Sequence, residues 1–232
     1  MDELVIGVIG GKGTYATVDF FRRLADAFPG EKEWDRPRMI IDNYCTMPSR
    51  VRAILYNERR QELVDDLVSS TRNLIRAGAN KLVLVCNTSH VFLPDILREV
   101  PESETLFVNI IEELAKQISA TEVRELGLIA SEGTIDTGIY SKIFEPYGIR
   151  VNAPDEAQFA LLRDFIESIK QNNLDEKTMA AFGEYIDSFQ EDAVILGCTE
   201  LPILYSACVK NGFTTKKMIF DPLQSVIDAL KK

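Results

Sequence analysis

The feature that most constrains the fold is the alternation of short apolar runs with longer amphipathic segments along the chain. The short runs are rich in Val and Ile, as in strands that are buried on both faces of a parallel sheet. We expect strands at residues 4–9, 39–43, 81–85, 105–109, 125–129, 150–151, 193–196 and 217–220. We expect helices at residues 14–28, 49–77, 94–99, 110–119, 137–147, 156–171, 176–189 and 222–231. This alternation predicts an α/β fold.

Two short segments occur twice, in the same order, about half a chain length apart. Residues 7–14 read GVIGGKGT and residues 127–134 read GLIASEGT, each an apolar run followed by small residues and Gly-Thr. Residues 83–88 read VLVCNT and residues 194–199 read VILGCT, each an apolar run that ends near a cysteine. Strand–turn–helix units resemble one another by chance, but the repeated cysteine favours two similar, Rossmann-like lobes.

The predicted lobes are related by a pseudo-twofold axis, with the active site in the cleft between them. We expect residues 1–100 and 209–232 in the first lobe and residues 101–208 in the second. No low-complexity linker separates them.

Composition excludes several classes of function. The chain has 232 residues and a formal net charge of −10, and a negative field of this kind repels nucleic acid. Its single histidine, His90, excludes metal sites that need two histidines, and the cysteines lack the spacings of zinc sites. We therefore expect no metal and no nucleic-acid partner.

Localisation follows from what the sequence lacks. No apolar stretch approaches the roughly 18 residues of a membrane span, and no signal-peptide pattern follows Met1. We expect a cytoplasmic protein that has no membrane partner and whose thiols are free.

Two of the four cysteines, Cys86 and Cys198, follow buried strands at corresponding positions of the predicted lobes. Ligands of parallel α/β sheets bind at the carboxyl ends of strands. Two thiols that face each other there can remove a proton from one face of a carbon atom and deliver one to the other face. A single buried cysteine is more often a small core residue. We assign that role to Cys45 and Cys208, and catalysis to the pair.

Polar residues follow both cysteines. Asn87, Thr88, Thr199 and Glu200 offer donors and an acceptor that can bind a carboxylate or poise a thiol, although the same residue types also cap helices. Glu200 either poises Cys198 or lies in the first turn of a helix, where the dipole favours an acid.

The glycine-rich loop at residues 10–13 has the form of a loop that cradles a phosphate or carboxylate. The acidic residue that a dinucleotide site needs about 20 residues later is missing, so the evidence for a nucleotide is weak. Arg50 follows a predicted turn and is suited to bidentate recognition of a carboxylate, or else is a solvated residue at a helix start. Lys12 either adds a cation for a distal carboxylate or points to solvent.

Taken together, GGKGTYAT at residues 10–17, CNTSH at 86–90 and GCTEL at 197–201 resemble the aspartate/glutamate racemase family over essentially the whole chain. GCTEL is similar to the aspartate-racemase branch. The resemblance implies two α/β lobes with the C-terminal helix returning to the first, a homodimer, and no pyridoxal phosphate, metal or nucleotide.

The resemblance also implies roles for individual residues. It makes Cys86 and Cys198 the acid/base thiols of an amino-acid racemase. Residues that would bind the substrate are Gly11, Thr14, Arg50, Asn87, Thr88, Lys170, Thr199 and Glu200. Lys12, Thr14 and Tyr15 depart from the family's usual glycine loop, and Ser49 departs from its Pro-Asp-Arg segment. These departures affect side-chain specificity more than the reaction.

Other functions stay open at this point. The same scaffold is compatible with a hydantoin racemase, an arylmalonate decarboxylase or a maleate isomerase. The paired thiols disfavour the decarboxylase, which needs only one cysteine, and the isomerase uses cysteine as a nucleophile. A non-catalytic amino-acid-binding protein and a nucleotide-dependent enzyme are the alternatives from other classes.

Overall fold

The computed structural model describes residues 3–232, which form two compact units. Unit 1 runs as far as Ile110 and resumes at Leu223, and unit 2 is Ile111–Pro222. From the sequence, these divisions were expected after residues 100 and 208. The difference arises because the segment around Phe107 pairs with the sheet of unit 1, and the strand Met218–Phe220 pairs with the sheet of unit 2.

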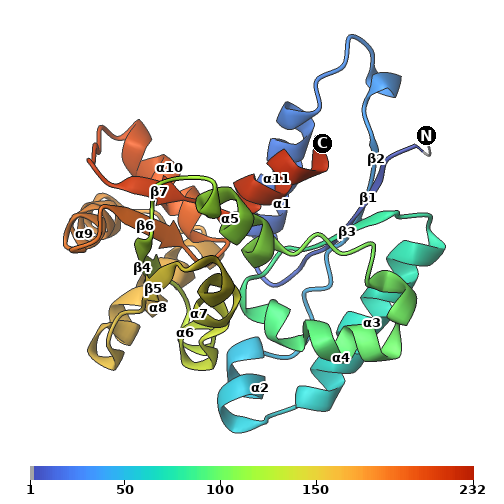
Figure 1. The fold of residues 1–232 in the computed structure, drawn as a ribbon, viewed down its shortest axis with the longest axis horizontal. Coiled ribbons are helices and arrows are strands. Elements are labelled where there is room, and N and C mark those ends of the chain that lie inside the picture. Colours follow the sequence, from blue (N-terminus) through green and yellow to red (C-terminus); the bar gives the residue numbers. More distant parts are fainter. Residues whose placement is uncertain (1–2) are drawn as a thin grey trace. The chain divides into compact units, whose positions relative to one another are not determined.

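Unit 1 is built around a parallel sheet whose strands lie in the order β2-β1-β3 (Figure 1). Its strands are β1 (Val5–Ile9), β2 (Arg38–Asp42) and β3 (Lys81–Leu84). Its α-helices are α1 (Thr14–Ala27), α2 (Arg50–Tyr56), α3 (Arg60–Arg76), α4 (Leu93–Glu99) and α11 (Pro222–Leu230). Short 3-10 turns lie at Glu33–Asp35, Thr88–Phe92 and Pro101–Ser103.

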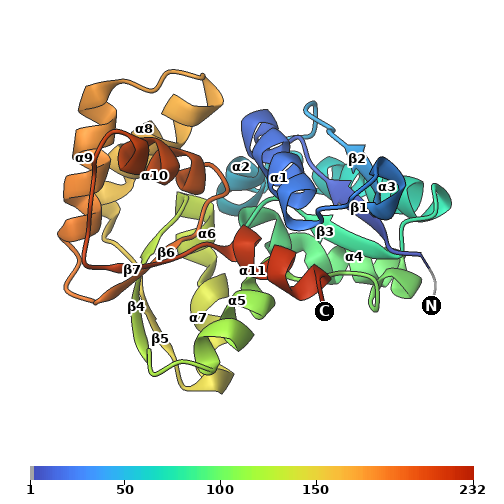
Figure 2. The ribbon, with the colours of Figure 1, turned by 90° about the horizontal axis from the view of Figure 1, so that it is seen from above.

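The order of the strands decides which helices cover which face. The chain passes from β1 to β2 on one side and then returns across β1 to β3 on the other. Right-handed connections therefore place α1 and α3 on opposite faces of the sheet. The C-terminal helix α11 lies beside α1, to which Gln224 is joined by a hydrogen bond from Arg23 (Figure 2).

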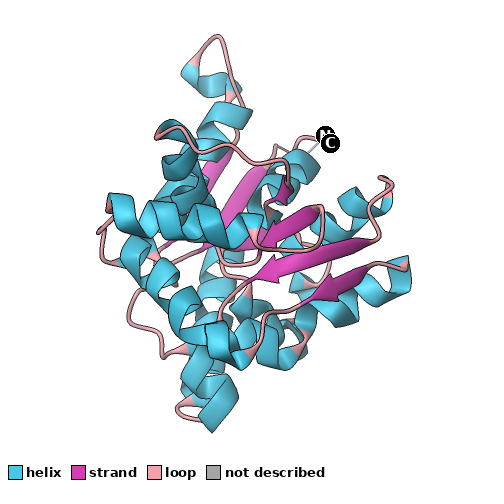
Figure 3. Cartoon of the chain, turned by 90° about the vertical axis from the view of Figure 1, so that its left-hand side faces the viewer, coloured by secondary structure: helices cyan, strands magenta, loops and turns pink. Residues whose placement is uncertain are grey.

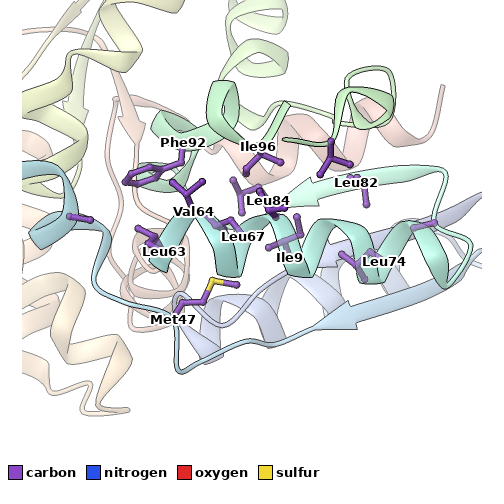
Figure 4. Close-up of a cluster of buried hydrophobic side chains, with 14 residues drawn as sticks. Ile9, Met47, Leu63, Val64, Leu67, Leu74, Leu82, Leu84, Phe92 and Ile96 are labelled. Atoms are coloured by element: carbon purple, nitrogen blue, oxygen red, sulfur yellow. The ribbon is translucent and has the colours of Figure 1, made fainter. Parts of the chain in front are cut away.

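The face of the sheet that α3 covers carries the main core of unit 1 (Figure 4). Leu63, Leu67 and Leu74 repeat along α3 at helical spacing and pack against Ile9 and Leu84 of the strands. All five side chains are buried. This core fixes the strands whose carboxyl ends carry the glycine loop and Cys86.

Unit 2 has a parallel sheet in the order β5-β4-β6-β7 (Figure 1). Figure 3 shows the strands of the chain as magenta arrows among the cyan helices. Its strands are β4 (Glu125–Ile129), β5 (Arg150–Asn152), β6 (Ala193–Leu196) and β7 (Met218–Phe220). Its α-helices are α5 (Ile110–Ser119), α6 (Glu132–Thr137), α7 (Ile139–Phe144), α8 (Phe159–Lys170), α9 (Glu176–Asp187) and α10 (Leu201–Lys210). Short 3-10 turns lie at Glu145–Tyr147 and Glu156–Gln158.

The second core forms where α8, α9 and α10 pack together on one face of this sheet. Phe165 and Phe182 lie edge to face, with ring centroids 5.1 Å apart, and both contact the strand face that carries Ile129 and Leu196. Cys208 belongs to this cluster and is buried, as predicted. The same rule of handedness places α6 and α7 on the opposite face.

The two sheets share one topology. The order β2-β1-β3 of unit 1 corresponds to β5-β4-β6 of unit 2, and the bridge at Phe107 beside β3 corresponds to β7 beside β6. The predicted α/β class, with parallel sheets in two similar lobes, is confirmed.

Three predicted elements differ from the structure. The helix expected at residues 49–77 is broken between α2 and α3, because Asn57 and Arg59 adopt left-handed backbone angles (φ 55° and 49°). The helix expected at 137–147 is interrupted at Gly138, which also has positive φ. The strand expected at 105–109 is reduced to one bridge, since the amides of Leu106 and Phe107 donate to Ser103.

Among the described residues, none of the helices combines the length and the apolar character that crossing a membrane requires.

The glycine loop provides a test of the packing. Gly11 has φ +80°, and an added Cβ would lie 2.4 Å from the Tyr44 carbonyl carbon. Gly78 of the same unit has φ +98°, but its nearest neighbour is 4.0 Å away. We expect Gly78→Ala to cost about 1–2 kcal/mol from the backbone angle alone, and Gly11→Ala to cost several kcal/mol more. Urea unfolding of both variants would check this, and equal costs would contradict it.

Candidate active site

In unit 1, three loops leave the same edge of the sheet. The amide of Val85 donates to the carbonyl of Ile9 (3.0 Å), so β1 and β3 stay paired until the glycine loop and Cys86 begin. The amide of Gly10 donates to the carbonyl of Asp42 (2.9 Å), which ties the glycine loop to the end of β2. Parallel pairing therefore brings the glycine loop, the segment after Asp42 and the Cys86 segment together.

The glycine loop is closed on itself. The Gly11 amide donates to Oγ1 of Thr17 (3.2 Å), and that hydroxyl donates to the carbonyl of Gly13 (3.1 Å). The amides of Gly10 and Gly11 are therefore occupied within the protein. This arrangement disfavours a phosphate cradle, which would need those amides to point at the ligand.

Lys12 projects from this loop into the protein. Only 4% of the residue is exposed, so the alternative that it points to solvent is wrong. Its Nζ donates to Sδ of the buried Met47. Burial lowers the pKa of Lys12 to about 8, against an opposing effect of Cys86, and Arg50 lowers it further.

Arg50 is the first residue of α2, and one guanidinium nitrogen donates to the carbonyl of Lys12 (2.8 Å). Its buried Nε has no hydrogen-bond partner. Thr14 lies at the start of α1, where Oγ1 and the Cys45 Sγ are 3.3 Å apart. Cys45 is exposed, so its assignment to the core was wrong.

Cys86 begins a buried segment that includes Asn87, Thr88 and His90. The His90 Nδ1 donates to the carbonyl of Cys86 (2.9 Å). Burial lowers the pKa of His90 to about 4, so the imidazole is neutral at pH 7. His90 thus holds the backbone at the cysteine and is not poised as an acid at that pH.

In unit 2, Cys198 follows β6 as Cys86 follows β3. The amide of Gly197 donates to the carbonyl of Ile129 (2.7 Å), the counterpart of the bond between Val85 and Ile9. The Sγ of Cys198 and the hydroxyl of Thr199 both donate to Oε2 of Glu200, each at 3.1 Å. Glu200 is 3% exposed, so its carboxylate is committed to this local network.

Lys170 lies within electrostatic range of that network. Desolvation lowers the pKa of Lys170, but the hydrogen bond to Glu167 and the charges of Glu200 and Cys198 outweigh it, and the net shift is upward. Its Nζ is 2.8 Å from Oε1 of Glu167.

Tyr140, on α7, is a residue that the sequence analysis missed. Burial, with Asp221 and Cys198 nearby, raises its pKa well above the usual value, so the phenol stays protonated. An aromatic residue inside a predicted helix gave no signal that it would lie within electrostatic range of Cys198.

The structure thus groups Lys12, Arg50 and Cys86 in unit 1, and groups Lys170, Cys198, Thr199 and Glu200 in unit 2. In residues 3–232, no three His, Cys, Asp or Glu side chains lie close enough together to hold a metal ion.

Comparison with known proteins decides the family. A family model described as Asp/Glu/Hydantoin racemase matches residues 6–230. The chain belongs to the Asp/Glu/Hydantoin racemase family. The predictions that it resembles the aspartate/glutamate racemases and that it is an isomerase of the racemase type are confirmed.

Relatives in the family carry several substrate names. The broad specificity amino-acid racemase RacX of Bacillus subtilis (strain 168) is 27% identical over 203 residues, which are 85% of this chain and 86% of RacX. The Picrophilus torridus aspartate racemase has a TM-score of 0.79 at 23% identity, covering 98% of this chain and 92% of its own, and supports the fold alone.

An aspartate racemase homologue from Pyrococcus horikoshii OT3 has a TM-score of 0.72 at 26% identity, covering 100% of this chain and 98% of its own. Glutamate racemases also match. Membership of the racemase family is therefore established at a level that does not select one amino acid.

The buried His90 makes stability depend on pH in a defined direction. Its pKa is lower in the folded protein than the usual 6.5, so its contribution is complete above pH 6.5 and is lost as the pH falls towards 4. Between pH 7 and pH 4 we expect the wild type to lose about 3 kcal/mol more unfolding free energy than His90→Gln. Urea unfolding at both pH values would measure the difference, and equal losses would contradict it.

Proposed function

We propose that this racemase interconverts the L and D forms of an acidic amino acid, aspartate first, by moving the α-proton between Cys86 and Cys198. One observation carries the proposal. Each cysteine follows the strand that pairs with the first strand of its unit, in two units of the same topology. A proton transfer on both faces of one carbon atom needs two groups of the same kind, and two units of the same topology supply two such thiols.

The proposed step is a pair of proton transfers. The thiolate of one cysteine takes the α-proton, so the Cα–H bond breaks and its electron pair stays on the Cα–carboxylate unit. The thiol of the other cysteine gives its proton to the opposite face of Cα and becomes the thiolate. The reverse assignment serves the other enantiomer, and the sum changes neither charge nor oxidation state.

The polar groups around the cysteines support this chemistry. In the proposal, Thr14, Asn87, Thr88 and Thr199 hold the α-carboxylate and ammonium group, where negative charge develops as the proton leaves. Lys170 and Glu200 act beside Cys198, within the network that the hydrogen bond from Cys198 begins. In the proposal, these donors and the cation of Lys170 stabilise the negative charge that develops.

The substrate is the finer part of the proposal. Arg50, with one guanidinium nitrogen on the Lys12 carbonyl and a buried Nε without a hydrogen-bond partner, supports a substrate that brings an additional carboxylate. The name of RacX, a broad specificity amino-acid racemase, supports a wider range of amino acids as the competing choice. The family resemblance also leads us to propose a homodimer that needs no added cofactor, which sedimentation and assay in plain buffer test.

The first assay is proton NMR of L-aspartate, L-glutamate and L-alanine, each separately, in D₂O with the enzyme. We expect the α-proton signal of aspartate to disappear fastest and the D isomer to accumulate on chiral analysis. Exchange with alanine alone would overturn the acidic substrate and keep the racemase. Exchange with none of the three would contradict the proposal as a whole.

Cysteine variants test the two-base mechanism. We expect Cys86→Ala and Cys198→Ala each to lower kcat for racemisation by at least about 10³-fold, since each removes one of the two proton carriers. Each variant keeps one of the two proposed acid/base thiols, so it should still exchange the α-proton of one enantiomer with D₂O. The two variants should act on opposite enantiomers.

The matched control is Cys208→Ala, which removes a thiol from the core of unit 2. We expect the folded control to racemise at the wild-type rate. Full racemisation by both single variants would refute the proposed mechanism, and exchange of the same enantiomer by both would refute the assignment of one thiol to each face.

A further inference from the structure

The side chain of Lys12 is buried without a counterion. Its Nζ donates to a thioether sulfur, a weak acceptor, and no carboxylate lies within ion-pair distance in the described part of the chain. An ammonium group removed from water without a paired charge costs several kcal/mol. The fold therefore keeps a cation where cations are expensive, which is typical of a site that receives an anion.

Arg50 brings a second cation to the same place. Its hydrogen bond to the Lys12 carbonyl fixes the loop at the residue that carries the ammonium group. Its buried Nε has no hydrogen-bond partner. Two cations that raise each other's electrostatic cost, each with unused donors, would both be stabilised by one shared carboxylate.

Neither of the acidic groups that act on Lys12 forms an ion pair with it. Asp66 accepts a hydrogen bond from the Tyr44 hydroxyl (2.9 Å), and Asp42 is at the end of β2. Both influence the Lys12 ammonium group only as charges, as does Cys86. The influence of Cys86 shows that the ammonium group lies within electrostatic range of the proposed acid/base thiol.

We propose that Lys12, together with Arg50, binds the side-chain carboxylate of a dicarboxylic amino acid and so determines specificity in this racemase. This inference rests on the proposed function. The α-carboxylate is left to the donors that follow the two cysteines.

Comparing L-aspartate with L-asparagine as substrates tests whether Lys12 binds the side-chain carboxylate. They have nearly the same shape, and only aspartate carries the second carboxylate. We expect Lys12→Met to lower the preference for L-aspartate over L-asparagine in kcat/KM by about 10²-fold, through KM for aspartate, with kcat/KM for asparagine nearly unchanged. The exposed Lys32→Met is the matched control and should keep the wild-type preference.

Each other outcome is decisive. An unchanged preference overturns the inference, and so does an equal fall with both substrates, which would mean that Lys12 acts on the reacting thiol. Racemisation of neutral amino acids alone by the wild type overturns the inference but keeps the proposed racemase function.

Binding without turnover supplies a second readout. In the Cys198→Ala background we expect calorimetry to give tighter binding of L-aspartate than of L-asparagine, and Lys12→Met to abolish the difference. Equal affinities in the parent background would overturn the inference even if no variant turned over. A misfolded Lys12→Met protein would be recognised by circular dichroism, and Lys12→Gln then takes its place.

The charge of Lys12 predicts the direction in which the preference for aspartate changes with pH. Lys12 is charged below its pKa of about 8, and the groups that act on it are Cys86, Arg50, Asp66 and Asp42. The aspartate preference should therefore hold below pH 8 and fall up to about tenfold per pH unit above it. Because thiol ionisation affects both substrates, it cancels in the ratio. A flat ratio across pH 7–10 in the wild type would overturn the inference.

Discussion

The hydrogen bonds from Val85 to Ile9 and from Gly197 to Ile129 are the interactions on which the proposed site depends. Each joins two parallel strands at the last residues before their loops. Strands that end together must release their loops together, so a cysteine after one strand and a glycine loop after the other are neighbours without any contact of their own. The cores under α3 and between α8, α9 and α10 hold these strand ends in register.

Burial then decides what the polar residues at these ends can do. His90 is neutral because its protonated form would have to be desolvated, and its remaining role is to fix the Cys86 carbonyl. Tyr140 is kept protonated by the same effect. Lys12 sits between these cases, since its pKa of about 8 leaves it mostly charged at pH 7. The cost of desolvation thus makes His90 a neutral anchor for the backbone, keeps Tyr140 protonated and leaves Lys12 a cation that titrates near pH 8.

Local sequence predicted those features that depend on neighbours along the chain. The apolar runs of β4 and β6 were placed with their observed bounds, because a fully buried strand needs no distant partner to be recognised. The repeated cysteine motif predicted the two units, because the same frame was used twice. The sequence also identified Lys170 and Glu200 as residues to examine, and they lie near Cys198.

What it missed depends on local backbone turns and on how loops lie against one another, neither of which the apolar pattern encodes. The break between α2 and α3 falls at Asn57 and Arg59, neither of them a glycine or proline, so composition gave no warning. The strand expected at residues 105–109 had the right residues, but a turn at Ser103 took its amides. The burial of Lys12 and the exposure of Cys45 depend on how the loop after β2 lies against the glycine loop, and no periodic pattern encodes that.

The repeat also shows which parts of such a frame are free to diverge. Lys12 of unit 1 corresponds to Glu132 of unit 2, which is paired with Arg163. Both cysteines have a cation within electrostatic range, Lys12 for Cys86 and Lys170 for Cys198, but Cys198 also donates to the Glu200 carboxylate, a bond that exists only while the thiol keeps its proton. An amino acid presents two like faces of Cα to the acid and base but unlike groups at its two ends. In the proposed reaction, the two thiols must therefore do the same chemistry, while the residues around them must differ. The substrate has a single side-chain carboxylate, so a cation on the glycine loop of one unit alone, Lys12, matches it.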